Sequence, residues 1–374
     1  MLTSTDTPPH DAGLRPTVSS PPLTVIYSIG KSGEEGRLYE RELAASSTAS
    51  VRFVPFNHRE ALGGTVYYEA VQLDRDYRAL HPRLQRLHRR LEETIAEHGA
   101  RCLLVTHDQV YHPDYLLKLP LYRAYYTGDD PGATYQRTIP YLHAFHHIFH
   151  CAIPYSREKT LGQKLRECGA RHVDFLPLGA FDYELDPSAT EDSILARPRD
   201  IDLIYVGSPF FAQKFQGFLE LTRAFGDQLK IYGFWKAKHS IYLSLHARRR
   251  IWVRSVSLAE RVRLYQRAKI GFNMHWDAWG LGNQRLYHLP ANGVMQICDC
   301  PEYLGDIFDP QREVVPVASF GEMMDRARYY LAHDEERRVI ALGGFRRVQR
   351  DYRLRTVMHR LADMIVRGMT ADGI

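Results

Sequence analysis

The 374-residue sequence contains no apolar run of 18 residues, so no segment offers the length of apolar helix that a membrane span requires. Cysteine is scarce: five residues, an odd number, are scattered along the chain, which argues against a disulfide framework and for a reducing, cytoplasmic location. The net charge is only +5, and no aromatic-and-basic recognition motif accompanies it, which argues against nucleic acid as a partner. The content of 44% hydrophobic and 25% charged residues is typical of a globular protein, and the length favours two domains.

The first 22 residues lack the apolar core of a secretion signal. They are rich in Ser, Thr and Pro, a composition that cannot bury enough apolar surface to fold. We therefore predict a disordered leader over residues 1–22.

The densest basic run extends from His246 to Arg250. The simplest interpretation is a solvated helix face. An anionic substrate, or an acceptor at a membrane surface, would also suit this charge.

Short apolar runs alternate with helical patterns in two halves of the chain, which predicts an α/β protein with doubly wound parallel sheets. The first half, residues 23–180, has predicted strands at 24–29, 51–54, 101–106, 122–126, 148–152 and 173–175, and predicted helices at 34–45, 77–97 and 155–168. The second half, residues 201–352, has predicted strands at 202–206, 229–232, 270–274, 294–298 and 314–316, and predicted helices at 211–225, 257–268, 284–292, 320–332 and 335–349. Residues 181–200, with prolines and acidic residues, are interpreted as a hinge, and residues 353–374 as a C-terminal helix that crosses back to the first domain.

The segment 270–301 is the most informative of the chain. A glycine turn that includes Gly282 and ends at Asn283, a good N-cap, leads from one strand into the helix 284–292, which Gly293 closes. Such a helix start presents N–H groups and the positive end of the helix dipole to an anion, and Arg285 adds a planar positive group suited to phosphate oxygens. A plain connection in a parallel sheet, with Arg285 solvated, is the alternative interpretation.

Other candidate binding residues follow the ends of predicted strands, where open α/β sheets bind ligands. Gly207 and Ser208 end one strand and would let a phosphate approach the backbone, although a turn at this position needs no ligand. Gly233 and Trp235 follow another strand, and the aromatic ring there is either a platform for a nucleotide base or an ordinary core residue. The remaining candidate binding residues are Lys214, His275 and Asp277, which are otherwise surface polar residues.

Two pairs of residues in the first half are candidates for a general base. His107 and Asp108 end a strand, and Asp129 and Asp130 precede a proline, where a simple turn is the alternative. We expect no metal site. The four histidines at 143–150 have helical spacing, but residues 148–152 alternate like a strand, so the histidines do not share one face. The Cys-Asp-Cys at 298–300 lacks a partner pair for zinc.

Residues 200–361 contain an ordered series of short motifs: Tyr205-Val206-Gly207-Ser208, Ala268 to Asn273, Gly282 to His288, Ala291-Asn292-Gly293, Tyr303-Leu304, Ile307-Phe308, Tyr329-Tyr330-Leu331 and Glu335-Glu336-Arg337. In this series the segment resembles the C-terminal domain of CgeB-like (spore maturation protein-like) glycosyltransferases. In the first half, Asp129-Asp130-Pro131 and 175–179 are similar to landmarks of the same family. The resemblance implies a GT-B fold, with two facing Rossmann-like domains and an inter-domain cleft.

The resemblance also implies an activity: a hexosyltransferase-type enzyme that moves a sugar from a nucleotide-diphosphate donor, UDP- or GDP-linked, to an acceptor without a catalytic metal or cofactor. The donor is expected on the C-terminal domain and the acceptor, which is a protein, a glycan, a lipid or a small natural product, on the N-terminal domain.

One departure from the related retaining enzymes concerns a pair of glutamates, the second of which usually holds the donor ribose. Their positions correspond to Gly280 and His288 here, and His288 can bind hydroxyl groups but is not a carboxylate. The choice between inversion and retention therefore stays open. So do two other functions, a nucleotide-sugar epimerase or hydrolase of the same fold and a non-catalytic scaffold.

Overall fold

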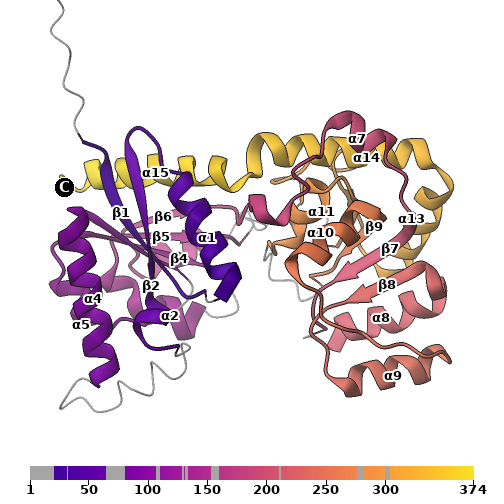
Figure 1. Ribbon diagram of the computed structural model, residues 1–374, viewed down its shortest axis with the longest axis horizontal. Helices are drawn as coiled ribbons and strands as arrows, with labels where there is room; N and C mark the ends of the chain where they lie inside the picture. The colour runs from indigo at the N-terminus through magenta and orange to yellow at the C-terminus, as the bar shows by residue number, and fades with distance from the viewer. Residues whose placement is uncertain are drawn as a thin grey trace, which may run out of the picture.

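The computed structural model contains two α/β domains, each built around a parallel sheet (Figure 1). It describes residues 21–31, 33–64, 81–106, 110–128, 130, 134–152, 160–209, 212–275, 282–299 and 304–374. Every strand predicted from the sequence has a counterpart, with ends that shift by a few residues. No helix within these ranges is both long and apolar enough to cross a membrane.

The N-terminal sheet has six parallel strands in the order β2-β1-β3-β4-β5-β6. These are β1 Leu23–Ile29, β2 Val51–Asn57, β3 Cys102–Thr106, β4 Tyr122–Thr127, β5 His147–His150 and β6 His172–Phe175. The central strand β3 reads CLLVT and is buried at every position, as expected for a sheet covered on both faces. The covering elements are α1 Gly33–Ala45, α2 His58–Ala61, α4 Pro82–His98, α5 Pro113–Lys118, η1 Thr134–Thr138, η2 Ile139–Ala144 and α6 Leu161–Glu167.

The C-terminal sheet has five parallel strands in the order β11-β10-β9-β7-β8. They are β7 Ile201–Val206, β8 Leu229–Tyr232, β9 Ala268–Asn273, β10 Met295–Cys298 and β11 Val315–Pro316. The helices of this domain are α8 Ala212–Phe225, α9 Ala237–Ala247, α10 Leu258–Arg267, α11 Arg285–Ala291, α13 Phe320–Ala332 and α14 Asp334–Arg347, with the short turn η4 Gly226–Gln228. The sequence analysis does not predict α9, because its apolar residues do not form one inward stripe: Leu243 is buried while Ile241 and Leu245 are exposed.

The chain passes between the domains twice, and the two passages contact each other. Residues 181–200 contain η3 Asp182–Glu184 and α7 Glu191–Ala196, and the return passage leads from η5 Val348–Tyr352 into α15 Leu354–Ala371. Ala180 N–H donates to the carbonyl of Tyr352 (2.7 Å), and Leu354 N–H donates to the carbonyl of Ala180 (2.9 Å).

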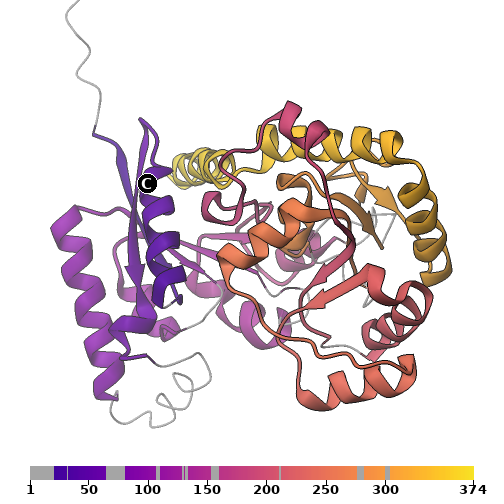
Figure 2. The same cartoon turned by 45° about the vertical axis from the view of Figure 1, so that its right-hand side comes forward.

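Helix α15 extends from the C-terminal domain along the N-terminal one (Figures 1 and 2). Its apolar face joins the core on one side of the N-terminal sheet, through Leu354, Val357, Met358, Leu361, Ala362, Ile365 and Met369. The last helix of the chain is therefore a structural part of the first domain.

Candidate functional site

The ends of β7 and β8 approach each other at two glycines. A Cβ atom on Gly233, whose φ is +142°, would lie 2.0 Å from the carbonyl oxygen of Gly207. Gly207 N–H donates to the carbonyl of Tyr232 (2.9 Å), and the Trp235 indole N–H donates to the carbonyl of Gly207 (2.8 Å). These contacts fix the turn after β7 and leave no room for a side chain at Gly233.

Trp235 belongs to the core of the C-terminal domain. Its ring centroid lies 5.0 Å from that of Phe218 and 6.0 Å from that of Phe215. The aromatic ring that is presented to solvent after β8 is that of Phe234, which is 72% exposed. Trp235 therefore supports the Gly207 turn from within the core of the domain. This position matches the interpretation of Trp235 as a core residue and not the interpretation as a platform for a nucleotide base.

The start of α11 is tied to the end of β9 by side-chain amides. The N-cap residue of α11 is Gln284, one residue after the predicted Asn283. Asn283 still supplies the capping hydrogen bond, because its Oδ1 accepts the N–H of Leu286 (3.2 Å). Its Nδ2 donates to Oδ1 of Asn273 (2.9 Å), and the same oxygen accepts from Nε of Arg285 (3.2 Å). Asn273 is fully buried, and among the residues that the structure describes its Nδ2 has no hydrogen-bond partner.

Arg285 connects α11 with the turn after β7, so it is not the solvated residue of the alternative interpretation. Its Nη1 donates to the carbonyl of Val206 (2.7 Å), and its guanidinium carbon lies 4.3 Å from the ring centroid of Tyr205. A Cβ atom on Gly207 would lie 2.2 Å from this Nη1. The structure thus brings Gly207 and Arg285, which are distant in sequence, into direct contact. We call Gly207, Asn273, Asn283 and Arg285 the arginine cluster.

His275, just after β9, is paired with Asp299, just after β10. Oδ1 of Asp299 lies 2.8 Å from Nδ1 of His275, and its Oδ2 accepts the main-chain N–H of His275 (2.6 Å). Nε2 of His275 is buried and makes no hydrogen bond with any described residue. The sequence analysis missed Asp299, although its place at the carboxyl end of a buried strand is a recognisable signal.

The same pair has a cysteine beside it. Sγ of Cys298 lies 3.8 Å from Nδ1 of His275, and the ligand atoms of His275, Cys298 and Asp299 all lie within 4.8 Å of one another. If any part of the described chain held a metal ion, these three residues would be the ligands. Because both carboxylate oxygens of Asp299 already contact His275, a role in orienting the histidine explains the arrangement without an ion.

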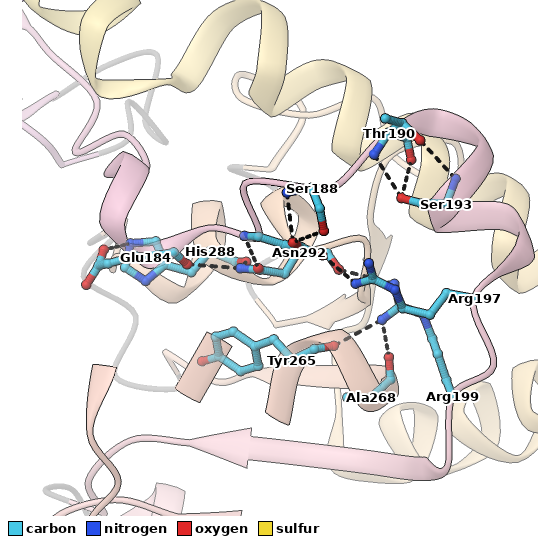
Figure 3. A network of polar contacts seen from close by, with 11 residues as sticks. Glu184, Ser188, Thr190, Ser193, Arg197, Arg199, Tyr265, Ala268, His288 and Asn292 are labelled. Carbon is cyan, nitrogen blue, oxygen red and sulfur yellow. Dashed lines mark hydrogen bonds and ion pairs between the residues drawn. The ribbon is translucent and has the colours of Figure 1, made fainter. Parts of the chain in front are cut away.

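His288, at the position where related enzymes have their second glutamate, contacts a carboxylate from elsewhere in the chain (Figure 3). Glu184 of η3 forms buried ion pairs with His288 and with Arg261 of α10. Burial by itself would raise the pKa of Glu184, but the contacts with His288 and Arg261 lower it below the ordinary value. Nδ2 of Asn292 also donates to the carbonyl of Glu184 (3.2 Å), so η3 is held against α11.

A buried arginine holds the other end of α11 (Figure 3). Arg199 donates to the carbonyls of Tyr265 (3.0 Å), Ala268 (2.6 Å) and Asn292 (3.1 Å). Burial lowers the pKa of Arg199 to about 9. The contacts of Arg199 thus join α10, the start of β9 and the end of α11.

The remaining predicted site residues lie in both domains. Lys214 is buried in the first turn of α8, Gly282 is buried next to Asn283, and the carbonyl of Ser208 accepts from the Tyr205 hydroxyl (3.4 Å). In the N-terminal domain, Asp130 is buried and accepts from the hydroxyl of Thr138 (2.6 Å). His107, Asp108, Asp129 and Asp277, and also Gly280, lie outside the described residues.

Comparison with known proteins bears on both the family and the fold. Residues 214–363 match the family model described as glycosyl transferase-like. No curated protein matches the sequence significantly. A glycosyltransferase from Rickettsia africae ESF-5 has a similar structure, with a TM-score of 0.63 at 9% identity over 93% of this chain and 99% of that chain. HepE of Anabaena in complex with UDP-glucose gives a TM-score of 0.57 at 10% identity over 92% and 99%.

The chain has a GT-B fold. A putative UDP-N-acetylglucosamine 2-epimerase from Listeria monocytogenes is also similar, with a TM-score of 0.51 at 13% identity over 88% of this chain and 94% of that chain. The GT-B fold predicted from the sequence is therefore confirmed. The segment that matches the glycosyl transferase-like model contains Asn273, His275, Asn283 and Arg285, whereas Gly207 precedes it.

Proposed function

We propose that the protein is a metal-independent glycosyltransferase of the CgeB-like, hexosyltransferase type, which moves a sugar from a UDP-linked donor to an acceptor. The observation that carries the proposal is the arginine cluster, a fixed guanidinium beside a side-chain-free turn at the carboxyl ends of β7 and β9. The match of residues 214–363 to the glycosyl transferase-like model supports a transferase. The complexes of HepE with UDP and with UDP-glucose support the choice of nucleotide.

Sugar transfer breaks the bond between the anomeric carbon and the diphosphate oxygen, and the leaving diphosphate gains negative charge. In a site without a metal, the protein must supply the positive groups that stabilise this charge. Arg285 uses Nε and one N–H of Nη1 in contacts with described residues, and Nη2, which bonds to none of them, is proposed to donate to the diphosphate. Nδ2 of Asn273, which has no partner among the described residues, offers a further donor in the same cluster.

His275 is proposed to contact the donor through Nε2. Asp299 holds the ring at Nδ1 and the main chain at N–H, so the direction of Nε2 is set before a ligand binds. Pre-orientation of this kind reduces the entropy lost on binding and keeps the nitrogen aligned with the reacting diphosphate and sugar.

The pair Glu184 and His288 is proposed to support the site. Both side chains are buried in their ion pair, which attaches the interdomain segment to α11. In α11, His288 stands where related enzymes have their second glutamate. A carboxylate is nevertheless present beside this helix, and it is that of Glu184 in η3. Whether the reaction inverts or retains the sugar configuration is measured on the product.

Nucleotide binding tests the proposal directly. We expect UDP to raise the melting temperature by roughly 5–10 °C, because a ligand at ~100 times its dissociation constant stabilises by about 2.7 kcal/mol. GDP, dTDP, ADP and CMP are the comparison ligands, and addition of EDTA should leave the shift unchanged. Arg285→Ala should abolish it, whereas Arg263→Ala, an exposed arginine of α10 in the same domain, should not.

The other functions predict different results. An epimerase or hydrolase would consume UDP-sugar with no acceptor present, and product analysis by NMR would detect the epimer or the free sugar. A scaffold would show no shift with any nucleotide, and this result would overturn the proposal. A shift that EDTA removes would refute the metal-independent form of it.

A further inference from the structure

The C-terminal domain presents apolar and basic side chains together on α9 and the segment that follows it. We define the α9 surface as the exposed residues Lys236, Lys238, Ile241, Leu245, Arg250 and Trp252. Helix α9 lies at the outer edge of its domain in both ribbon views (Figures 1 and 2). The surface shares no residue with the arginine cluster, so this inference does not depend on the proposed function.

The apolar side chains of this surface are exposed to a degree that is uncommon for their type. Ile241 is 55% exposed, Leu245 is 70% exposed and Trp252 is 67% exposed. Ile241 and Leu245 are four residues apart in the helix and therefore share a face. The opposite face of α9, with Leu243, packs toward α8.

Trp252 is held beside α9 by main-chain contacts on both sides. Oγ of Ser244 accepts the N–H of Ile251 (2.9 Å), and Oγ of Ser240 accepts the N–H of Val253 (3.2 Å). Since both neighbours of Trp252 are attached to the helix, the exposed ring projects from a fixed backbone and not from a free loop.

The positive charge of the whole protein is concentrated here. Residues 228–259 contain seven Lys and Arg and no Asp or Glu, whereas the net charge of the chain is +5, so the rest of the chain is slightly acidic. Arg249 and Arg254 form ion pairs with Asp227 and Glu260. The cations of the α9 surface form no ion pair within the described part of the chain.

We propose that the α9 surface docks the protein on an anionic lipid bilayer. A helix with exposed Ile and Leu beside Lys and Arg, together with a Trp, has the chemistry of a segment that lies in the membrane interface. The apolar side chains enter the boundary between headgroups and acyl chains, and the ammonium and guanidinium groups contact lipid phosphates. Nucleic acid would use the charges but would gain nothing from Ile241 and Leu245, so the apolar residues favour lipid.

Vesicle co-sedimentation of the full chain tests the proposal, with phosphatidylcholine vesicles that contain or lack phosphatidylglycerol. We expect binding only to the anionic vesicles and weaker binding at high salt. Each surface cation contributes about fivefold in affinity, so the triple variant Lys236→Gln, Lys238→Gln, Arg250→Gln should bind on the order of 100-fold more weakly. The matched control removes three exposed cations of α4 and α5, Arg89→Gln, Arg90→Gln and Lys118→Gln, and should keep its affinity.

The apolar half of the surface needs its own variant. The double variant Ile241→Gln, Leu245→Gln should lose at least tenfold in affinity for anionic vesicles. The matched control Leu117→Gln, Val339→Gln replaces exposed apolar residues of α5 and α14 and should keep its affinity for anionic vesicles. Circular dichroism and the melting temperature establish that each variant is folded.

Several results would overturn the proposal. One is equal binding to neutral and anionic vesicles, or no binding to either. Another is an equal loss in the α4 and α5 control, since binding would then reflect overall charge. A third result combines two observations: the triple charge variant loses binding to a DNA duplex or an RNA strand, and the apolar double variant still binds vesicles normally. Together these would make the surface a nucleic-acid site.

Discussion

Gly207→Ala provides a sharp test of the arginine cluster, because the structure specifies which atom the new methyl group would meet. The added Cβ would lie 2.2 Å from Nη1 of Arg285 and 2.9 Å from the hydroxyl of Tyr205. Gly207 does not have a left-handed backbone conformation, so alanine is not excluded by φ, and the effect is one of contact. An ordinary contact distance of about 3.5 Å requires the guanidinium to move by more than about 1 Å.

The size of the effect follows from the contacts that this movement breaks. The hydrogen bond from Nη1 to the carbonyl of Val206 is 2.7 Å long and would not survive it. Loss of a hydrogen bond from a charged donor lowers the free energy of unfolding by about 1.5–3 kcal/mol. Displacing a reacting or binding group by ~1 Å lowers the rate or the affinity by up to about 100-fold. We therefore expect the dissociation constant for UDP to rise about 10- to 100-fold.

The assay is isothermal titration of UDP into the wild type and four variants. Gly321→Ala is the matched control, since its Cβ would meet nothing closer than Oγ of Ser319 at 3.8 Å, and it should bind UDP normally. Additivity is measured by urea unfolding: in the Arg285→Ala background, Gly207→Ala should lower the free energy of unfolding little further, because the atom that it displaces is gone. Unchanged UDP affinity in a folded Gly207→Ala, or full additivity of the two substitutions, would refute the reasoning.

Three further perturbations test other parts of the molecule. Burial raises the pKa of Glu42 to about 7. The contribution of the protonated Glu42 carboxyl to the free energy of unfolding is therefore fully present below about pH 4.5 and is lost as the pH rises through 7. Glu42→Gln keeps an acceptor for the N–H of Asp182 (2.6 Å), so in urea it should be more stable than the wild type above pH 7 and equally stable near pH 4. Asp299→Asn should reduce kcat/KM for sugar transfer about 10- to 100-fold, because an amide no longer accepts both N–H groups of His275, and a normal rate would exclude this orienting role. Gly368→Ala places a Cβ atom 2.3 Å from a buried tyrosine hydroxyl of the N-terminal sheet. The substitution should therefore loosen the packing of α15 against that sheet and lower the melting temperature. Unchanged protection of the α15 amides in hydrogen exchange would contradict this packing.

Local sequence signals were reliable wherever a few neighbouring residues specify the backbone. Gly293 has a φ of +68° at the end of α11, as its place after the helix predicts. Ser257 caps α10 by accepting the N–H of Glu260 (3.2 Å). Short apolar runs became strands because a parallel sheet covered on both faces buries most of the side chains of its inner strands, as in β3 and β7.

Signals were insufficient where one residue type has two common uses. Trp235 at a strand end was open to two interpretations, and only the packing of α8 against the sheet shows that its ring belongs to the core. Helix α9 was missed because it exposes Ile241 and Leu245, which breaks the periodic pattern that identifies a surface helix.

The sequence by itself determined the α/β class, the alternation of strands and helices, and the helix start at Asn283 and Arg285, because periodicity, caps and glycines act within a few residues. Only the tertiary structure decided that Arg285 contacts the end of β7, that Asp299 orients His275, and that Glu184 pairs with His288. These partners come from separate segments, and their proximity depends on the strand order β10-β9-β7 and on the path of the interdomain segment. That order results from burying the apolar faces of the whole sheet at once, which no local stretch of sequence encodes.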